Sequence, residues 1–217
     1  VLAWPWSISF SSREDDLSTA KPLTVGIPVF NGAATLARCL ASLAKVPTDF
    51  IDIFIADNAS TDGTEAICRA FAAERPNVTY ARHHRNIGAL DNFFFLIDKC
   101  STRYFMWLAD DDWIDNGFLE AAVNFLDSHP AHVLVTAASA YYSESTGSYE
   151  FTTSTASLEE DTIEGRVLSF TSQLIDNSEF YGVYRREVLT RASDLKPVIG
   201  ADWVSTINSV AQGKLKA

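Results

Sequence analysis

Three adjacent carboxylates, Asp110, Asp111 and Asp112, directly follow the apolar run at 106–108. Neighbouring carboxylates about 5 Å apart repel each other by about 3 kcal/mol at an effective dielectric constant near 20. The cluster is therefore unfavourable unless a cation lies among its oxygens. Oxygen-only ligation with no histidine nearby predicts Mg²⁺ or Mn²⁺ rather than zinc. A solvated loop that caps the next helix is the alternative.

Polar segments also follow three earlier apolar runs, which span 23–29, 51–56 and 77–81. The residues there that could contact a ligand are Phe30, Asn31, Asp57, Asn86 and Gly88. Phe30 could stack on a base or pack in the core, and Asp57 could bind a base or ribose or simply turn the chain. Asn86 and Gly88 suit close approach to a ligand and are also ordinary turn residues.

Apolar runs and amphipathic helices alternate through the first part of the chain. The predicted strands are 23–29, 51–56, 77–81 and 103–108, and the predicted helices are 35–45, a second from about 61, 90–100 and 117–128. Near-continuous apolar strands separated by single helices predict a parallel sheet covered on both faces. Ligands bind outside the carboxyl ends of such strands, so the polar segments are expected to converge on one crevice.

The later part of the chain has a different pattern. Residues 133–142 and 149–153 flank a turn and predict a hairpin. A strand is predicted at 180–184, helices at 163–175, 186–193 and 202–212, and a last strand begins near residue 214. We expect an irregular arm at 1–21 and one domain at 22–217, and we expect the natural protein to continue beyond residue 217.

Composition narrows the class of protein. A chain of 217 residues fits one domain, and its net charge of −11 argues against a nucleic-acid partner. No apolar run approaches the roughly 18 residues that a membrane-spanning helix needs, although peripheral membrane contact stays open. Cys39, Cys68 and Cys100 are odd in number and far apart, which favours buried reduced thiols and a cytoplasmic setting.

Four segments in order resemble the family 2 glycosyltransferases. They are 25–32, 57–64, 85–89 with Asn92, and 109–113. The resemblance covers residues 23–128 and weakens beyond 130 to 180–186 and 200–203.

The resemblance implies an α/β GT-A fold, the Rossmann-like nucleotide-diphospho-sugar transferase fold. Its mostly parallel sheet has helices on both faces and a small mixed portion on the acceptor side. Residues 22–128 would form the nucleotide-sugar-binding half and 129–217 the acceptor-side half. The implied activity is transfer of a sugar, with inversion, from a nucleotide-diphosphate donor to a hydroxyl acceptor, with Mn²⁺ or Mg²⁺ as cofactor. The acceptor would be a saccharide or a lipid-linked saccharide, as in surface polysaccharide or glycolipid synthesis, with peripheral contact at the inner membrane face left open.

Site residues are carried over from the family by position. The residues implied to bind the nucleotide sugar are Pro28, Phe30, Asn31, Asp57, Asn86, Gly88 and Asp110. Asp57 would contact the base and Asp110 would lie near the ribose. Asp111 would be the principal metal ligand and Asp112 the alternate. Many members carry an aspartate where Ala109 stands, so the division of roles among the three aspartates stays open.

Asp202 aligns best with the family's catalytic base, which takes the proton of the acceptor hydroxyl. Its alternative role is to cap the helix that begins near Val204. Two other functions compete with glycosyl transfer. A nucleotidyltransferase would bring basic residues into the first loop, and the loop at 30–34 has none. A non-catalytic sugar-nucleotide-binding scaffold would have lost its acids, yet Asp57, Asp111 and Asp202 are all present.

Overall fold

The computed structural model describes residues 21–153, 156–173, 177–192 and 200–217. The predicted arm at 1–21 lies outside these ranges except for Lys21, which pairs with Asp52 at 2.6 Å. The elements of the first half are β1 (Leu23–Val29), α1 (Leu36–Leu43), β2 (Ile51–Asp57), α2 (Thr64–Glu74), β3 (Val78–Arg82), α3 (Ala89–Asp98), β4 (Tyr104–Trp107) and α4 (Asn116–Ser128). Those of the second half are β5 (His132–Val135), β6 (Ser139–Ser143), β7 (Ser148–Thr153), α5 (Ile163–Ser172), the 3₁₀ helix η1 (Ser178–Tyr181), β8 (Val183–Arg185), α6 (Arg186–Ala192), α7 (Ala201–Gln212) and β9 (Lys214–Lys216).

The central sheet has the strand order β3-β2-β1-β4-β8-β5-β9. Strands β3, β2, β1 and β4 are parallel to one another, and β9 is parallel to β5. Strand β8 is antiparallel to both of its neighbours, β4 and β5. The predicted mostly parallel sheet with a mixed portion in the second half is therefore confirmed.

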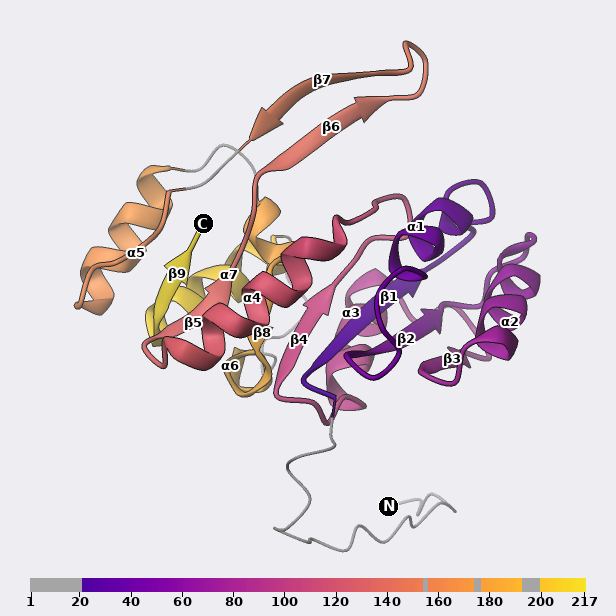
Figure 1. Ribbon diagram of the computed structural model, residues 1–217, viewed down its shortest axis with the longest axis horizontal. Helices are drawn as coiled ribbons and strands as arrows, with labels where there is room; N and C mark the ends of the chain where they lie inside the picture. Colours follow the sequence, from indigo (N-terminus) through magenta and orange to yellow (C-terminus); the bar gives the residue numbers. More distant parts are fainter. Residues whose placement is uncertain (1–20, 154–155, 174–176, 193–199) are drawn as a thin grey trace, which may run out of the picture.

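Apolar side chains on the two faces of the sheet form two separate cores. On one face, Val25 and Ile27 of β1 pack with residues of α1 and α4. On the other face, Phe105 and Trp107 of β4 pack with residues of α3, α6 and α7. Figure 1 shows the helices on both sides of the strands. Gly26 is required between the layers, because a Cβ there would lie 2.7 Å from Phe105 Cζ.

The predicted strand at 133–142 is divided between two sheets. Strand β5 is buried at all four residues, whereas most of β6 is exposed. Strand β8 pairs with β5 at Leu134 and Val135, and the segment that leads into β8 turns at Gly182. The pairing between β5 and β8 therefore ends at Val135. Beyond Val135 the chain leaves the central sheet and continues as β6, which pairs antiparallel with β7 as the predicted hairpin. Figure 1 shows this hairpin projecting beyond the central sheet.

The predicted strand at 180–184 begins instead as the short helix η1. Phe180 stacks on the buried Trp107 ring, with 4.4 Å between centroids and 12° between planes. Hydrogen bonds from Phe180 N to Asn177 O at 3.1 Å and from Gly182 N to Glu179 O at 3.0 Å close the helical turn in which this stack is made. Gly182 then lets the chain pass close to β5, because a Cβ there would lie 2.6 Å from Val135 O.

Replacing Phe180 with alanine tests the stacked pair. Phe180 is 6% exposed, so Phe180→Ala is expected to lower the free energy of unfolding by about 3 kcal/mol through lost burial and a cavity. Urea denaturation followed by circular dichroism measures the change. Phe151→Ala is the control, because Phe151 is 53% exposed and its loss should change stability by less than about 0.5 kcal/mol. Equal effects of the two substitutions would contradict the role of the stack.

Candidate active site

The three aspartates follow β4 at the carboxyl edge of the sheet. Leu108 is buried and continues the β4 ladder by donating its N–H to Gly26 O at 3.0 Å. Asp110 then lies against the loop that follows β1. A Cβ at Gly32 would overlap Asp110 Oδ2, and Thr35 Oγ1 lies 3.5 Å from the same oxygen. Gly32 therefore sets how closely the loop after β4, at 109–115 and called the acidic loop below, approaches the loop after β1.

A polar stripe on α1 and its first turn holds the rest of the acidic loop. Besides Thr35, Arg38 donates to Asp111 O at 3.4 Å, and Ser42 Oγ accepts from Ile114 N at 3.3 Å. These positions are spaced by three and four residues, so they share one side of the helix. Arg38 was not among the predicted site residues, although the helical spacing of Thr35, Arg38 and Ser42 is visible in the sequence.

Three of the predicted acids line one cavity of about 900 Å³. Asp111 and Asp112 reach it from the acidic loop, and Asp202 reaches it from α7. Tyr181 and Trp113 form part of its wall. The structure thus brings together residues that are some ninety positions apart in sequence.

Burial and neighbouring charge raise the pKa of two carboxylates in this region, Asp110 and Asp112. Withdrawal from bulk water and the charge of Asp111 raise the pKa of Asp110. The same two causes raise the pKa of Asp112, which the nearby Arg38 partly offsets. Burial and then the charge of Asp112 raise the pKa of Tyr181 to about 12, with further contributions from Asp111 and Asp202. The charges of these acids are therefore close enough together to affect the same groups.

Asp202 lies in the first turn of α7, but it is not the helix cap. The N-cap is Gly200, whose φ of 78° lies in the left-handed region that favours glycine. The capping alternative is therefore wrong. Asn177 Nδ2 donates to Asp202 Oδ2 at 3.1 Å, and Thr206 Oγ1 donates to Asn177 Oδ1 at 3.1 Å. This chain of hydrogen bonds fixes one carboxylate oxygen at the cavity wall.

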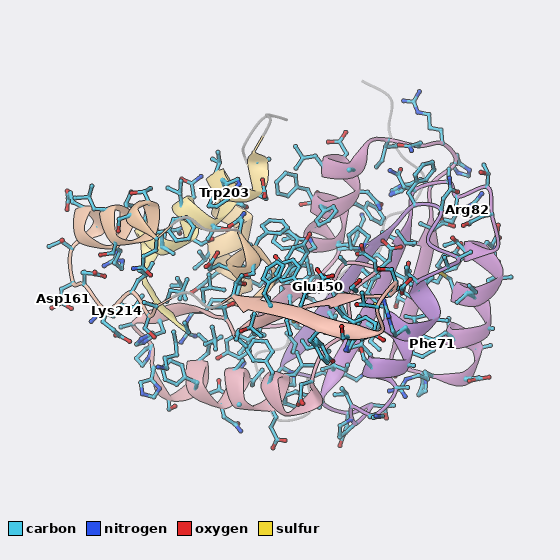
Figure 2. The ribbon with its side chains drawn as sticks, turned by 90° about the horizontal axis from the view of Figure 1, so that it is seen from above. Phe71, Arg82, Glu150, Asp161, Trp203 and Lys214 are labelled. Atoms are coloured by element: carbon cyan, nitrogen blue, oxygen red, sulfur yellow. The ribbon has the colours of Figure 1, made fainter. Side chains whose placement is uncertain are left out.

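Asp57 is enclosed at the end of β2, with 0% of its surface exposed. Its Oδ1 accepts from Ser60 N at 2.8 Å, and its Oδ2 accepts from Tyr80 at 2.7 Å and from Arg82 at 2.6 Å. Burial disfavours the charged carboxylate, but these hydrogen bonds outweigh it and lower the pKa of Asp57. Figure 2 places Arg82 at the β3 end of the molecule. The carboxylate thus ties β2 to β3, and a contact with a base would require exchange of one of these donors.

The predicted asparagines connect the loops that follow β1, β2 and β3. Asn31, at φ 55°, accepts from Thr61 N at 2.8 Å. Asn58 donates to Asn86 Oδ1 and to Gly88 O, both at 3.1 Å. The sequence analysis treated Asn31, Asn86 and Gly88 as ligand contacts, and the structure uses their polar groups to hold the loops together. Their contact with a nucleotide sugar stays a prediction.

The remaining predicted contacts, Phe30 and Pro28, are not among the residues that line the cavity. Phe30 is 48% exposed just after β1, whereas Pro28 is buried within the strand.

In the described part of the chain, no three His, Cys, Asp or Glu side chains are grouped to hold a metal ion. Across the same residues, every helix is too short or too polar to cross a membrane. Cys39 and Cys68 are buried, Cys100 is half-buried, and all three are free thiols.

Comparison with known families decides what kind of chain carries this site. The profile described as "Glycosyl transferase family 2" matches residues 24–191. The chain belongs to this family. The match extends from β1 through the acidic loop and the hairpin into α6.

Curated relatives of this family 2 glycosyltransferase chain come from bacteria. It is 26% identical over 124 residues to the minor teichoic acid biosynthesis protein GgaB of Bacillus subtilis, covering 56% of the chain and 14% of that protein. It is 27% identical over 132 residues to the glycosyltransferase GlyA of Streptococcus pneumoniae, covering 59% of the chain and 18% of that protein. The chain thus spans less than a fifth of either relative.

Solved structures share the GT-A fold of this family 2 chain. TarS 1-349 of S. aureus, in complex with UDP-GlcNAc, matches with a TM-score of 0.67 and 17% identity, over 89% of this chain and 55% of that one. The mannosyltransferase PcManGT of Pyrobaculum calidifontis, in complex with GDP-Man and Mn²⁺, matches with a TM-score of 0.63 and 18% identity, over 92% of this chain and 55% of that one. At these identities the likeness establishes the fold.

Substituting Asp57 tests its structural role. The folded state lowers the pKa of Asp57, so its stabilisation is present above the ordinary carboxyl pKa near 4 and is lost as pH falls through the lowered value. Asp57→Asn should therefore lower the free energy of unfolding by about 2 kcal/mol at pH 7, because a buried charge-assisted hydrogen bond is lost. The deficit should shrink below about pH 4.

Urea titrations of both proteins across this pH range measure the deficit. Asp52→Asn is the control on the same strand, since Asp52 is 45% exposed and its pair with Lys21 should contribute less than about 1 kcal/mol. A deficit at Asp57 that does not change with pH would contradict the assignment.

Proposed function

We propose that this chain is the catalytic domain of an inverting glycosyltransferase that moves a sugar from a nucleotide-diphosphate donor to a hydroxyl acceptor. The observation that carries the proposal is the convergence of Asp111, Asp112 and Asp202 on one cavity at the carboxyl edge of the sheet. The complexes of TarS with UDP-GlcNAc and of PcManGT with GDP-Man support a sugar nucleotide as donor.

Asp111 and Asp112 fit a divalent cation. Their oxygens are hard ligands of the kind that Mg²⁺ and Mn²⁺ take. The neighbouring cation Arg38 donates to the main-chain oxygen of Asp111 and pairs with Glu144 at 3.1 Å. Its charge only partly offsets the raised pKa of Asp112. A divalent cation, when bound, supplies positive charge to the diphosphate as the sugar leaves. The Mn²⁺ in the PcManGT complex supports this cofactor, and Mg²⁺ is the alternative.

Asp202 is the proposed general base. The acceptor oxygen forms a bond with the anomeric carbon while its proton passes to the carboxylate, and the bond from that carbon to the diphosphate oxygen breaks with its electron pair. Asn177 orients the carboxylate by donating to Oδ2. Attack from the face opposite the leaving group inverts the anomeric carbon, and no covalent sugar–enzyme intermediate is needed.

The setting is proposed from the relatives and the thiols. The name of GgaB places it in teichoic acid biosynthesis, which supports a role in the synthesis of a surface polysaccharide or glycolipid. Free buried cysteines support a reducing compartment, and hence the cytoplasm with peripheral contact at the inner face of the membrane.

Calorimetry with UDP, GDP and dTDP, each with and without Mn²⁺, tests donor binding. We expect one nucleotide to bind more tightly with the metal. Asp111→Asn should weaken that binding at least about tenfold and remove the gain from Mn²⁺, because the ligand loses its charge. Glu150→Gln is the control, since Glu150 is an exposed acid on β7, labelled in Figure 2. If no nucleotide shows metal-assisted binding, the proposed function is wrong.

Donor hydrolysis and sugar transfer test the base. Asp202→Asn should leave nucleotide affinity within about twofold of the parent and lower kcat for transfer about 10³-fold, because proton removal is lost. Donor binding without any turnover in the parent would identify a scaffold instead. Loss of nucleotide binding in Asp202→Asn would overturn the assignment of Asp202 as base.

A further inference from the structure

The β6–β7 hairpin presents a ladder of exposed aromatic rings. Its large exposed side chains are Tyr141, Tyr142, Tyr149 and Phe151, between 38% and 61% exposed. Tyr141 stacks on Phe151 with 4.4 Å between centroids, and Tyr142 meets Tyr149 at 5.4 Å. Exposed apolar patches of this kind commonly mark binding surfaces. The rings are therefore candidates for contact with a ligand.

Contacts from the acidic loop and α1 hold this hairpin over the cavity. Arg38 pairs with Glu144 at 3.1 Å, and its guanidinium lies 4.1 Å from the centre of the Trp113 ring. Trp113 in turn meets Tyr142 edge-on at 5.7 Å. Figure 2, seen from above, shows the hairpin lying across the middle of the molecule, with Glu150 on it. Tyr142 and Tyr149 line the same cavity as Asp202.

The charge of this surface limits what it can bind. Among the described residues that line the cavity, five carry carboxylates and one, Arg38, is cationic. The acids are Asp111, Asp112, Asp115, Glu144 and Asp202. A divalent cation and the diphosphate of a sugar nucleotide largely offset each other, so the excess negative charge persists. A polymer of phosphodiesters would be repelled here.

The hairpin also lacks the features of a membrane-binding surface. Residues 139–153 contain Glu144 and Glu150 but no lysine or arginine. Binding to an anionic lipid surface relies on such basic residues. Serine and threonine instead flank the rings at the ends of both strands, at positions 139, 143, 148, 152 and 153. Aromatic faces beside hydroxyl groups suit a sugar, whose ring carries apolar C–H groups and polar hydroxyls.

We infer that the cavity side of the β6–β7 hairpin is the platform for an uncharged saccharide acceptor, whose sugar rings stack on Tyr142 and Tyr149 and whose hydroxyl points to Asp202. The inference rests on the proposed function and adds to it the lack of charge on the saccharide acceptor and the surface that binds it. An uncharged acceptor differs from a polyol phosphate, whose phosphates carry negative charge. The platform and the donor site share the cavity but use different residues.

Saturation-transfer NMR on the full chain tests the platform without any nucleotide. The probes are neutral trisaccharides of glucose, galactose, mannose and N-acetylglucosamine, together with a glycerol phosphate oligomer. We expect at least one neutral trisaccharide to bind and the phosphate oligomer not to bind. Absence of binding by all four trisaccharides, or equal binding of the oligomer, would overturn the inference.

Two matched variants on β7 locate the contact. Tyr149 lines the cavity and is 61% exposed, whereas Phe151 lies outside the cavity lining and is 53% exposed. Tyr149→Ala should raise the trisaccharide Kd about tenfold through lost stacking, and Phe151→Ala should leave it within about twofold. Equal losses in both variants, or Tyr149-dependent binding to phosphatidylglycerol vesicles, would overturn the inference.

The nucleotide calorimetry keeps the two proposals distinguishable. Both β7 variants should retain the metal-assisted nucleotide binding of the parent, because neither residue belongs to the proposed donor site. Failure of nucleotide binding in the parent would remove the proposed function. Normal nucleotide binding together with failure of the saccharide tests would remove only the acceptor platform.

Discussion

Three neighbouring carboxylates follow a strand whose side chains are buried, and they repel one another where the sheet ends. Each of Asp110 and Asp112 has a raised pKa, in part from the charge of Asp111. The fold tolerates this because Leu108 anchors the segment in the core and Gly32 leaves room for the Asp110 carboxylate. Packing thus holds mutually repelling carboxylates together at this edge of the sheet, and the proposal of a bound cation starts from that arrangement.

The first half of the fold was predictable because its elements are defined by local patterns. Buried parallel strands are apolar along their whole length, so β1 ends at Val29 as expected and β2 extends only one residue further, to Asp57. The second half depends on contacts between distant residues. Phe180 belongs to a helical turn because Trp107 lies where its ring must stack. No local pattern around residue 180 records that contact.

The candidate site was predicted unevenly for a related reason. Asp111 and Asp202 were identified because the family resemblance fixes their positions, and both line the cavity. Arg38 was not predicted because ligands are expected at the loops after the strands, whereas Arg38 reaches the acidic loop from a helix. The aromatic hairpin was expected as a hairpin, but its position over the cavity depends on Trp113 and Glu144.

The hydrogen bonds within the site divide its polar residues into two groups with different physical roles. Asp57 accepts three hydrogen bonds from its own chain, and Asn58 makes contacts with Asn86 and Gly88. A polar group that is already satisfied in this way gains little from a ligand, and removing its partner leaves a buried group unpaired. Asp111 and Asp112 differ, because the neighbouring Arg38 side chain donates to the main-chain oxygen of Asp111 and pairs with Glu144 of the hairpin. Satisfied residues therefore hold the loops in register, and the carboxylates of Asp111 and Asp112 are the groups through which we propose that the ligand is recognised.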